Sequence, residues 1–421
     1  MLAKAGFCPI VIERGKDVEK RTKDVETFWN YGKLNPESNV SFGEGGAGTF
    51  SDGKLFTGNK DKYGIFAEIL HIFHEMGADK SVEYLSKPHI GTDVLKDVMQ
   101  NIRKTIICLG GEIHFSTCLI DISKAENKNY RLILKTPEGN KEILTRCVIL
   151  AIGHSARDTF KMLINHNFNF EPKPFAIGLR IEHPQEVINE AMYGKEYSKL
   201  LPAADYKLTY HASNGRSVFS FCMCPGGYVV NASSDPESLV VNGMSYHDRG
   251  SENSNSAIVV NVTPDDFPGN TAEDAINFQK ELEKKFYYAG AGKIPLQKLI
   301  DFKNGVKTEE LGKVKPEMKG QYVFSDISSC LPLYVRDAIV EAIYDFGRRL
   351  KGYDNPDTIL SGVESRTSSP VKILRDENFM AQNFPGIIPS GEGAGYAGGI
   401  TSAAQDGIRA AEMAAKYLLD I

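Results

Sequence analysis

The chain has 421 residues, of which 42% are hydrophobic and 24% are charged, and its formal net charge is −5. This composition is typical of a globular protein long enough for two domains, and it gives no basic surplus that would indicate a nucleic-acid partner. The sequence has neither an apolar run of membrane-spanning length nor a leader pattern, and its seven scattered cysteines lack zinc spacing. We therefore expect a cytoplasmic protein that acts on a small molecule, with no metal and no membrane partner.

The first predicted elements are the end of a helix at 1–6 and a short apolar strand at 8–14. In a dinucleotide-binding βαβ unit, the strand after the phosphate-binding helix ends on an acid that binds the adenosine ribose. Glu13 fits this role, and Arg14 follows it as a second candidate. Such a unit begins with a strand and a G-x-G-x-x-G turn, so we expect that this chain lacks these N-terminal elements.

Hydrophobic periodicity then predicts a charged helix at 16–30 and amphipathic helices near 63–76 and 92–109. The strands predicted after these helices are short: 112–115, 118–122, 130–135 and 147–152. The resulting order of elements is that of an α/β unit.

From about residue 168 to residue 378, predicted strands alternate with polar loops, and helices are predicted at 271–289 and 333–350. The polar run 251–256 is predicted to be a mobile surface loop. This change of pattern indicates a second unit inserted into the first.

The C-terminal segment predicts a strand at 386–390, a glycine-rich loop at 391–399 and an Ala-rich helix from residue 400 to about 419. Small residues let the backbone approach a flat ring, and a carboxylate in the loop can accept hydrogen bonds from sugar hydroxyls. The start of the helix presents N–H groups and the positive end of its dipole. We therefore predict a cofactor loop, and an ordinary strand-to-helix turn is the alternative. The predicted binding residues are Gly391, Glu392, Gly398, Gly399 and Ile400.

Four motifs carry a resemblance to a known family: 43–55 (GEGGAGTFSDGKL), 220–227 (SFCMCPGG), 362–370 (GVESRTSSP) and the C-terminal glycine loop. The chain is similar to FAD-dependent dehydrogenases of undefined substrate, which are distantly similar to glutathione-reductase-like flavoproteins. The resemblance implies an α/β fold with a discontinuous Rossmann-type FAD-binding domain at 1–167 and 379–421. An inserted α+β substrate domain would occupy 168–378.

The resemblance also places the 43–55 segment over the flavin and implies FAD as the cofactor, with NAD(P)H as a candidate electron donor. The spacing of Gly43, Gly45 and Gly48 matches G-x-G-x-x-G, but turn-forming residues follow it rather than a helix, so this segment is not the dinucleotide turn. A flexible surface loop is the alternative. Further cofactor-binding candidates lie here and after the strand at 147–152: Gly45, Gly46, Thr49, Ser51, Asp52, Gly53, Lys54, Ala151 and Gly153.

Cys222 and Cys224 are the sharpest catalytic candidates, with Lys54 as a third. Cysteines two apart on a strand point to one face, where a thiolate of low pKa could attack a substrate or exchange electrons with flavin. Because a disulfide between such residues is strained, a single reactive thiol and plain packing are the alternatives to a shuttling dithiol.

Arg180 and Arg366 stand near glutamates at predicted strand ends, where each could clamp a carboxylate substrate or form a structural Arg–Glu pair. His154 could be a general acid near the flavin or a structural residue.

Together these patterns predict an FAD-dependent oxidoreductase that passes a hydride or electrons through flavin to or from a small organic substrate. The alternatives are an RNA-modifying flavoprotein with a reactive cysteine and a truncated relative without activity. The net charge of −5 counts against the first of these.

Overall fold

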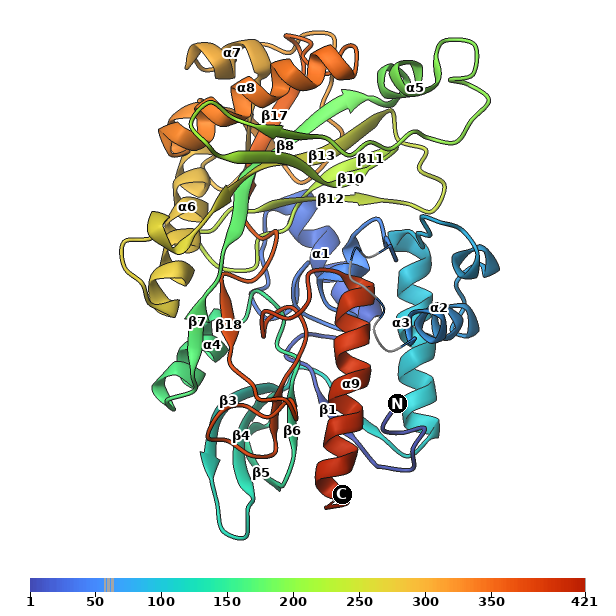
Figure 1. The fold of residues 1–421 in the computed structure, drawn as a ribbon, viewed down its shortest axis with the longest axis vertical. Helices are drawn as coiled ribbons and strands as arrows, with labels where there is room; N and C mark the ends of the chain where they lie inside the picture. The colour runs from blue at the N-terminus through green and yellow to red at the C-terminus, as the bar shows by residue number, and fades with distance from the viewer. Residues whose placement is uncertain (57, 59–60, 62–63, 421) are drawn as a thin grey trace.

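The computed structural model of the protein describes residues 1–56, 58, 61 and 64–420. Figure 1 shows an elongated molecule, with a large sheet and its helices at one end and smaller sheets with long helices at the other. The fold is mixed α/β, as the sequence predicts in general terms. No helix among these described residues is long and apolar enough to span a membrane.

The first strand forms a short parallel pair. β1 (Ile10–Ile12) pairs in parallel with β2 (Glu112–His114), at the positions of two predicted strands. The side chains of Ile10 and Val11 are 48% and 39% exposed. Residues 1–6 form hydrogen-bonded turns rather than the predicted helix end. A single turn has too few hydrogen bonds to offset the entropy cost of helix nucleation. The expectation of further N-terminal elements stays a prediction.

Three helices belong to this end of the molecule: α1 (Val18–Tyr31), α2 (Phe66–Glu75) and α3 (Thr92–Cys108). Asp17 caps α1 by accepting a hydrogen bond from Lys20 N at 2.9 Å, and Gly32 ends the helix with a φ of 70°. These bounds agree with the predicted helices to within a few residues. The predicted start of the second helix at residue 63 lies outside the described residues.

A second parallel pair joins β6 (Val148–Leu150) to β19 (Ile387–Pro389), and α9 (Ile400–Leu418) follows β19. Between β2 and β6, three strands form an antiparallel meander: β3 (Cys118–Lys124), β4 (Tyr130–Thr136) and β5 (Gly139–Thr145). The sequence did not predict β5, because its residues are mostly polar and exposed. The β6–β19 pair brings residue 150 to the start of the C-terminal glycine loop.

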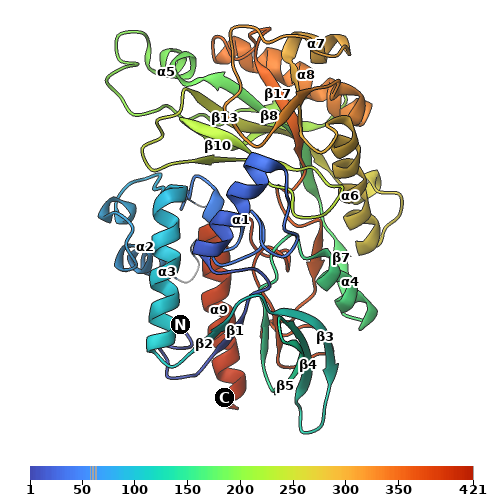
Figure 2. The same ribbon diagram turned by 180° about the vertical axis from the view of Figure 1, so that it is seen from behind.

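A seven-stranded sheet dominates the other end, in the order β16-β14-β17-β8-β13-β10-β9. Its central strand, β8 (Phe175–Pro184), is buried on both faces. The helix α8 (Leu333–Arg349) packs on one face and the three-stranded sheet β12-β11-β15 on the other, and Figure 2 shows α8 beside the sheet. The other strands are β9 (Thr209–His211), β10 (Ser217–Cys224), β11 (Gly227–Asn231), β12 (Val241–Ser245), β13 (Asn253–Val262), β14 (Ile294–Lys298), β15 (Met318–Lys319), β16 (Tyr322–Phe324) and β17 (Ile359–Glu364).

The strand pair β7 (Phe170–Pro172) and β18 (Val371–Ile373) lies where the chain enters and leaves the large sheet. The remaining helices are α4 (Arg157–Asn165), α5 (Gln185–Tyr193), α6 (Ala272–Ala289) and α7 (Leu299–Asn304). The division into 1–167, 168–378 and 379–421 stays a prediction.

The mobile surface loop predicted at 251–256 is wrong. Residues 253–256 begin β13, and Ser254, Asn255 and Ser256 are fully buried. Most polar side-chain atoms of this run find partners inside the protein, although the buried Asn255 Nδ2 has none. Asn253 donates to Lys315 O at 2.7 Å, and the hydroxyls of Ser256 and Tyr206 lie 2.9 Å apart. A polar run is therefore buried here because hydrogen bonds replace water.

Candidate functional site

Two hydrogen bonds tie the ends of the 43–55 segment to distant elements. The Glu13 carboxylate, at the end of β1, accepts hydrogen bonds from Gly15 N at 2.7 Å and Gly43 N at 3.0 Å. At the other end, Thr401 Oγ1 in the first turn of α9 donates to Leu55 O at 2.6 Å. The segment therefore connects the predicted ribose acid to the start of the C-terminal helix.

The turn after β6 contacts the loop after β19. A Cβ added to Gly393 would lie 2.3 Å from Gly153 O, so a larger residue does not fit there. His154 Nδ1 lies 3.7 Å from the Glu392 carboxylate. Both turns stand at the carboxyl ends of parallel strands, where α/β folds bind their ligands.

Several other glycines of these segments border open space. A Cβ added to Gly46, Gly153, Gly391 or Gly398 would meet no atom within 4 Å. Gly399 is the N-cap residue of α9, so no side chain caps the start of this helix. Its first-turn N–H groups and these bare glycines leave room and polarity for a ligand to approach the backbone.

The predicted cofactor-binding residues divide by exposure. The exposed ones are Gly45, Ala151, Gly153, Gly398 and Gly399, and the partly buried ones are Glu13, Arg14, Gly46, Ser51, Lys54, Glu392 and Ile400. The buried ones are Thr49, Asp52, Gly53 and Gly391. Some side chains already have partners within the chain, since Arg14 pairs with Asp158 and the Ser51 hydroxyl donates to Gly48 O at 2.6 Å.

Arg21 organises the 43–55 segment, and the sequence interpretation missed it. Its fully buried guanidinium donates to five backbone carbonyls: those of Asn39, Val40, Gly43, Glu44 and Gly46. Burial lowers the pKa of Arg21 to about 10. A signal was present, because Arg21 lies on the apolar stripe of α1, three residues after Val18 and four before Val25.

Lys54 links this segment to the large sheet. Its ammonium contacts the carbonyl oxygen of Met223 on β10 and pairs with Asp52 at 2.9 Å. Arg249 also pairs with Asp52, at 2.7 Å. Burial alone would raise the pKa of Asp52, but these two cations outweigh it and lower the value to about 2.

Cys222 and Cys224 lie beside this lysine, in an irregular part of β10. The register with β13 shifts between Phe221 and Cys224, and Cys222 has a φ of 44°. The Cys224 thiol donates to Cys222 O at 3.4 Å, and Arg180 donates to the same oxygen at 2.9 Å. The structure therefore brings together all three predicted catalytic residues.

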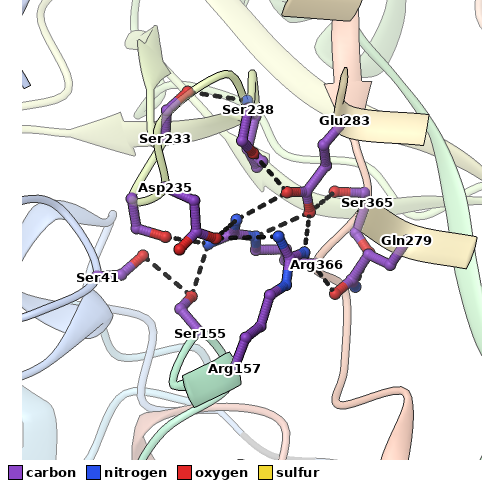
Figure 3. A network of polar contacts seen from close by, with 12 residues as sticks. Ser41, Ser155, Arg157, Ser233, Asp235, Ser238, Gln279, Glu283, Ser365 and Arg366 are labelled. Carbon is purple, nitrogen blue, oxygen red and sulfur yellow. Dashed lines mark hydrogen bonds and ion pairs between the residues drawn. The ribbon is translucent and has the colours of Figure 1, made fainter. Parts of the chain in front are cut away.

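Both predicted arginine sites contain Arg–Glu pairs. Arg180 donates to Glu364 at 2.8 Å. Figure 3 shows Arg366 and Arg157 converging on the buried carboxylate of Glu283, each at 2.8 Å. Burial alone would raise the pKa of Glu283, but the two arginines outweigh it and hold the pKa well below its usual range. These contacts favour the structural alternative for Arg180 and Arg366.

The network in Figure 3 connects five segments of the chain that are far apart in sequence. Ser155 follows the β6 turn, and its hydroxyl accepts from Arg366 at 2.7 Å and lies 3.2 Å from that of Ser41. Asp235, in the loop after β11, pairs with Arg157 at 3.0 Å. The turn after β6 is thus held against the large sheet. Among residues 1–56, 58, 61 and 64–420, no group of three or more His, Cys, Asp or Glu side chains could hold a metal ion.

Comparison with known proteins identifies the family. Residues 174–367 match the model described as "FAD-dependent protein, C-terminal domain-like". An uncharacterized protein from Clostridium beijerinckii is 48% identical over 415 residues, which is 98% of this chain and 77% of that protein. The chain belongs to one family with this Clostridium protein, and its residues 174–367 match a domain of FAD-dependent proteins. The assignment supports an FAD-dependent oxidoreductase enzyme in general terms.

Two solved structures are distant matches. A complex of aklavinone-11 hydroxylase with FAD and aklavinone is 10% identical, with a TM-score of 0.39, over 99% of this chain and 59% of that one. A flavoprotein/dehydrogenase from Cytophaga hutchinsonii is 10% identical, with a TM-score of 0.35, over 79% of this chain and 56% of that one. The chain thus spans less than two thirds of either protein, and neither match assigns a substrate.

Proposed function

We propose that the protein is an FAD-dependent dehydrogenase or reductase that passes a hydride or electrons to or from a small organic substrate, with NAD(P)H as the candidate donor. One observation carries this proposal: the 43–55 segment, the turn after β6 and the loop after β19 meet, while Gly46, Gly153, Gly391 and Gly398 face open space. Flat and hydroxylated cofactors need such bare backbone.

The residues fit FAD in distinct roles. Glu13 would bind the adenosine ribose, and Glu392 the hydroxyls of the ribityl chain. The uncapped first turn of α9 would direct N–H groups and the positive end of its dipole toward the pyrimidine edge of the flavin. FAD supplies the two-electron chemistry when bound. The domains proposed for these roles are 1–167 with 379–421 for the cofactor and 168–378 for the substrate.

The organisation around this site supports precise placement of the cofactor. Arg21 fixes the backbone of the 43–55 segment, and Lys54 connects this segment to β10. The Arg366–Glu283 network holds the turn after β6. These contacts would keep the cofactor face and the proposed substrate face in one orientation.

Glu392→Ala in the full-length native protein tests the cofactor assignment. Loss of a charge-assisted hydrogen bond should weaken FAD binding by about 1.5–3 kcal/mol. The exposed Glu138→Ala on the β4–β5 hairpin is the matched control and should leave FAD affinity unchanged. FAD titration measures both, and equal affinities for Glu392→Ala and the wild type would contradict the assignment. Stopped-flow reduction with NADH and with NADPH then identifies the donor.

A further inference from the structure

We propose that Cys222 and Cys224 form a dithiol that reduces low-molecular-weight disulfides. The proposal names a substrate class for the oxidoreductase. Only the return of two electrons and two protons to the oxidised pair rests on the proposed flavin function, because the reaction with substrate needs the two thiols alone.

The backbone at Cys222 is the first argument. Phe221 pairs with Ala257, but the next pair is Cys224 with Asn255, so β10 holds one extra residue and bulges. Cys222 has a backbone φ of 44°, which residues other than glycine seldom adopt. Bulges and left-handed residues gather at functional sites, where they redirect a side chain.

The positions of the two thiols give the order of attack. Cys222 is partly exposed, whereas Cys224 is fully buried and its thiol donates to Cys222 O at 3.4 Å. An incoming disulfide therefore meets Cys222 first. Cys224 lies behind it, in position to react second.

Two cations flank the pair and are themselves held in place. Lys54 contacts Met223 O and pairs with Asp52, while Arg180 donates to Cys222 O and pairs with Glu364. The neighbouring Cys224 thiol, Lys54 and Arg180 lower the pKa of Cys222 well below its usual value. The same coupling to Cys222, together with burial, raises the pKa of Cys224. Of the two cysteines, the partly exposed Cys222 is thus the one that carries the thiolate.

Other cysteines of the chain provide the contrast. Cys118, Cys147 and Cys330 have their pKa values raised by burial, that of Cys147 to about 11. At each of these three positions, burial is the largest influence on the pKa. Beside Cys222, by contrast, the two cations Lys54 and Arg180 oppose the effect of burial on the pKa.

The reaction balances in two steps. The Cys222 thiolate attacks R–S–S–R, so a bond forms between Cys222 Sγ and one sulfur, the S–S bond breaks, and RS⁻ leaves. Cys224 then loses its proton and attacks Cys222 Sγ, which releases the second RS⁻ and forms the Cys222–Cys224 disulfide. The substrate gains two electrons, the protein dithiol loses two, and the released thiolates take up protons, one of which comes from Cys224.

A single-turnover experiment on flavin-free protein tests the proposal. The background carries Cys8→Ser and Cys108→Ser, which remove the two exposed thiols. The reduced protein is mixed with bis(2-hydroxyethyl) disulfide and analysed by intact mass and peptide mapping. We expect loss of two hydrogens and a Cys222–Cys224 link. Cys224→Ser should stop at a mixed disulfide on Cys222, and Cys222→Ser should not react.

Reaction of Cys222→Ser at the wild-type rate would overturn the proposal, as would a wild type that forms no Cys222–Cys224 link. A second measurement does not require complete turnover. Lys54→Met should raise the pH of half-maximal Cys222 alkylation and Lys54→Arg should restore it, with Cys330→Ser as the control. An alkylation profile unchanged in Lys54→Met would also contradict the proposal. FAD titration of the native protein is separate, so intact flavin binding without disulfide reaction defeats this inference alone.

Discussion

The large sheet and the glycine-rich segments use the same residue types in opposite ways. Gly178 on β8 has no spare room, because an added Cβ would lie 1.9 Å from Ile258 O. Gly398 in the loop before α9 has no neighbour within 4 Å. Gly178 therefore allows strands to pack, whereas Gly398 leaves space unfilled.

The two buried arginines differ in a similar way. Arg180 in the sheet binds mainly side chains, those of Glu364, Asn242 and Asn255. Arg21 binds backbone carbonyls and so fixes the path of a loop. This difference supports the proposal that the glycine-rich region binds a ligand, whereas the large sheet stabilises the fold. Experiments that separate folding from cofactor binding can test the distinction.

The largest expected effect belongs to Gly178→Ala. The new methyl group would collide with the backbone of β13, so unfolding free energy should fall by more than about 4 kcal/mol. Gly398→Ala, which fills open space at an exposed position, should change stability by no more than about 0.5 kcal/mol. Urea denaturation compares both variants with the wild type. If both variants lost a similar amount of unfolding free energy, the proposed difference between the two regions would be wrong.

Glu182 in the large sheet predicts a stability loss on the alkaline side. Burial raises its pKa to about 8 from an ordinary value of 4.5, so the folded protein holds this proton more tightly than the unfolded chain. Stability from the protonated form is complete below about pH 4.5 and falls as the pH rises to about 8. Glu182→Gln should remove this slope and gain about 4 kcal/mol at pH 8. Denaturation curves of the wild type and of Glu182→Gln at pH 4.5 and pH 8 test this prediction. The same difference in unfolding free energy at both pH values would refute it.

Asp52 in the glycine-rich region predicts the opposite slope. Its pKa in the folded protein, about 2, lies below the ordinary value of 3.8. The stability that ionised Asp52 provides is therefore complete above pH 3.8 and disappears as the pH falls toward 2. Asp52→Asn should cost about 2 kcal/mol at neutral pH and nothing near pH 2. The exposed Asp420→Asn is the control, expected to cost less than about 0.5 kcal/mol. A cost for Asp52→Asn that does not change with pH would rule out this ion-pair explanation.

Periodicity and turn residues predicted most helices and the segments of the candidate site. The bounds of α3 and α9 follow directly from apolar spacing and flanking glycines. The contacts between those segments could not be predicted, since the Glu13–Gly43 hydrogen bond spans thirty residues of intervening fold. A polar strand start such as Asn253 looks like a loop until its buried partners are known. The bulge at Cys222 depends on the register with β13, which the sequence of β10 alone does not define.

The central claim is that the open glycines border the FAD site. FAD titration of the full-length native protein carrying Gly398→Leu, followed by flavin absorbance, tests it most directly. Gly407→Leu is the matched control, because Gly407 also has no neighbour within 4 Å but lies within α9, away from the loop. The account predicts at least tenfold weaker FAD binding for Gly398→Leu, about 1.4 kcal/mol, with unchanged folding stability and normal binding by Gly407→Leu. Wild-type FAD affinity in a folded Gly398→Leu variant would contradict it.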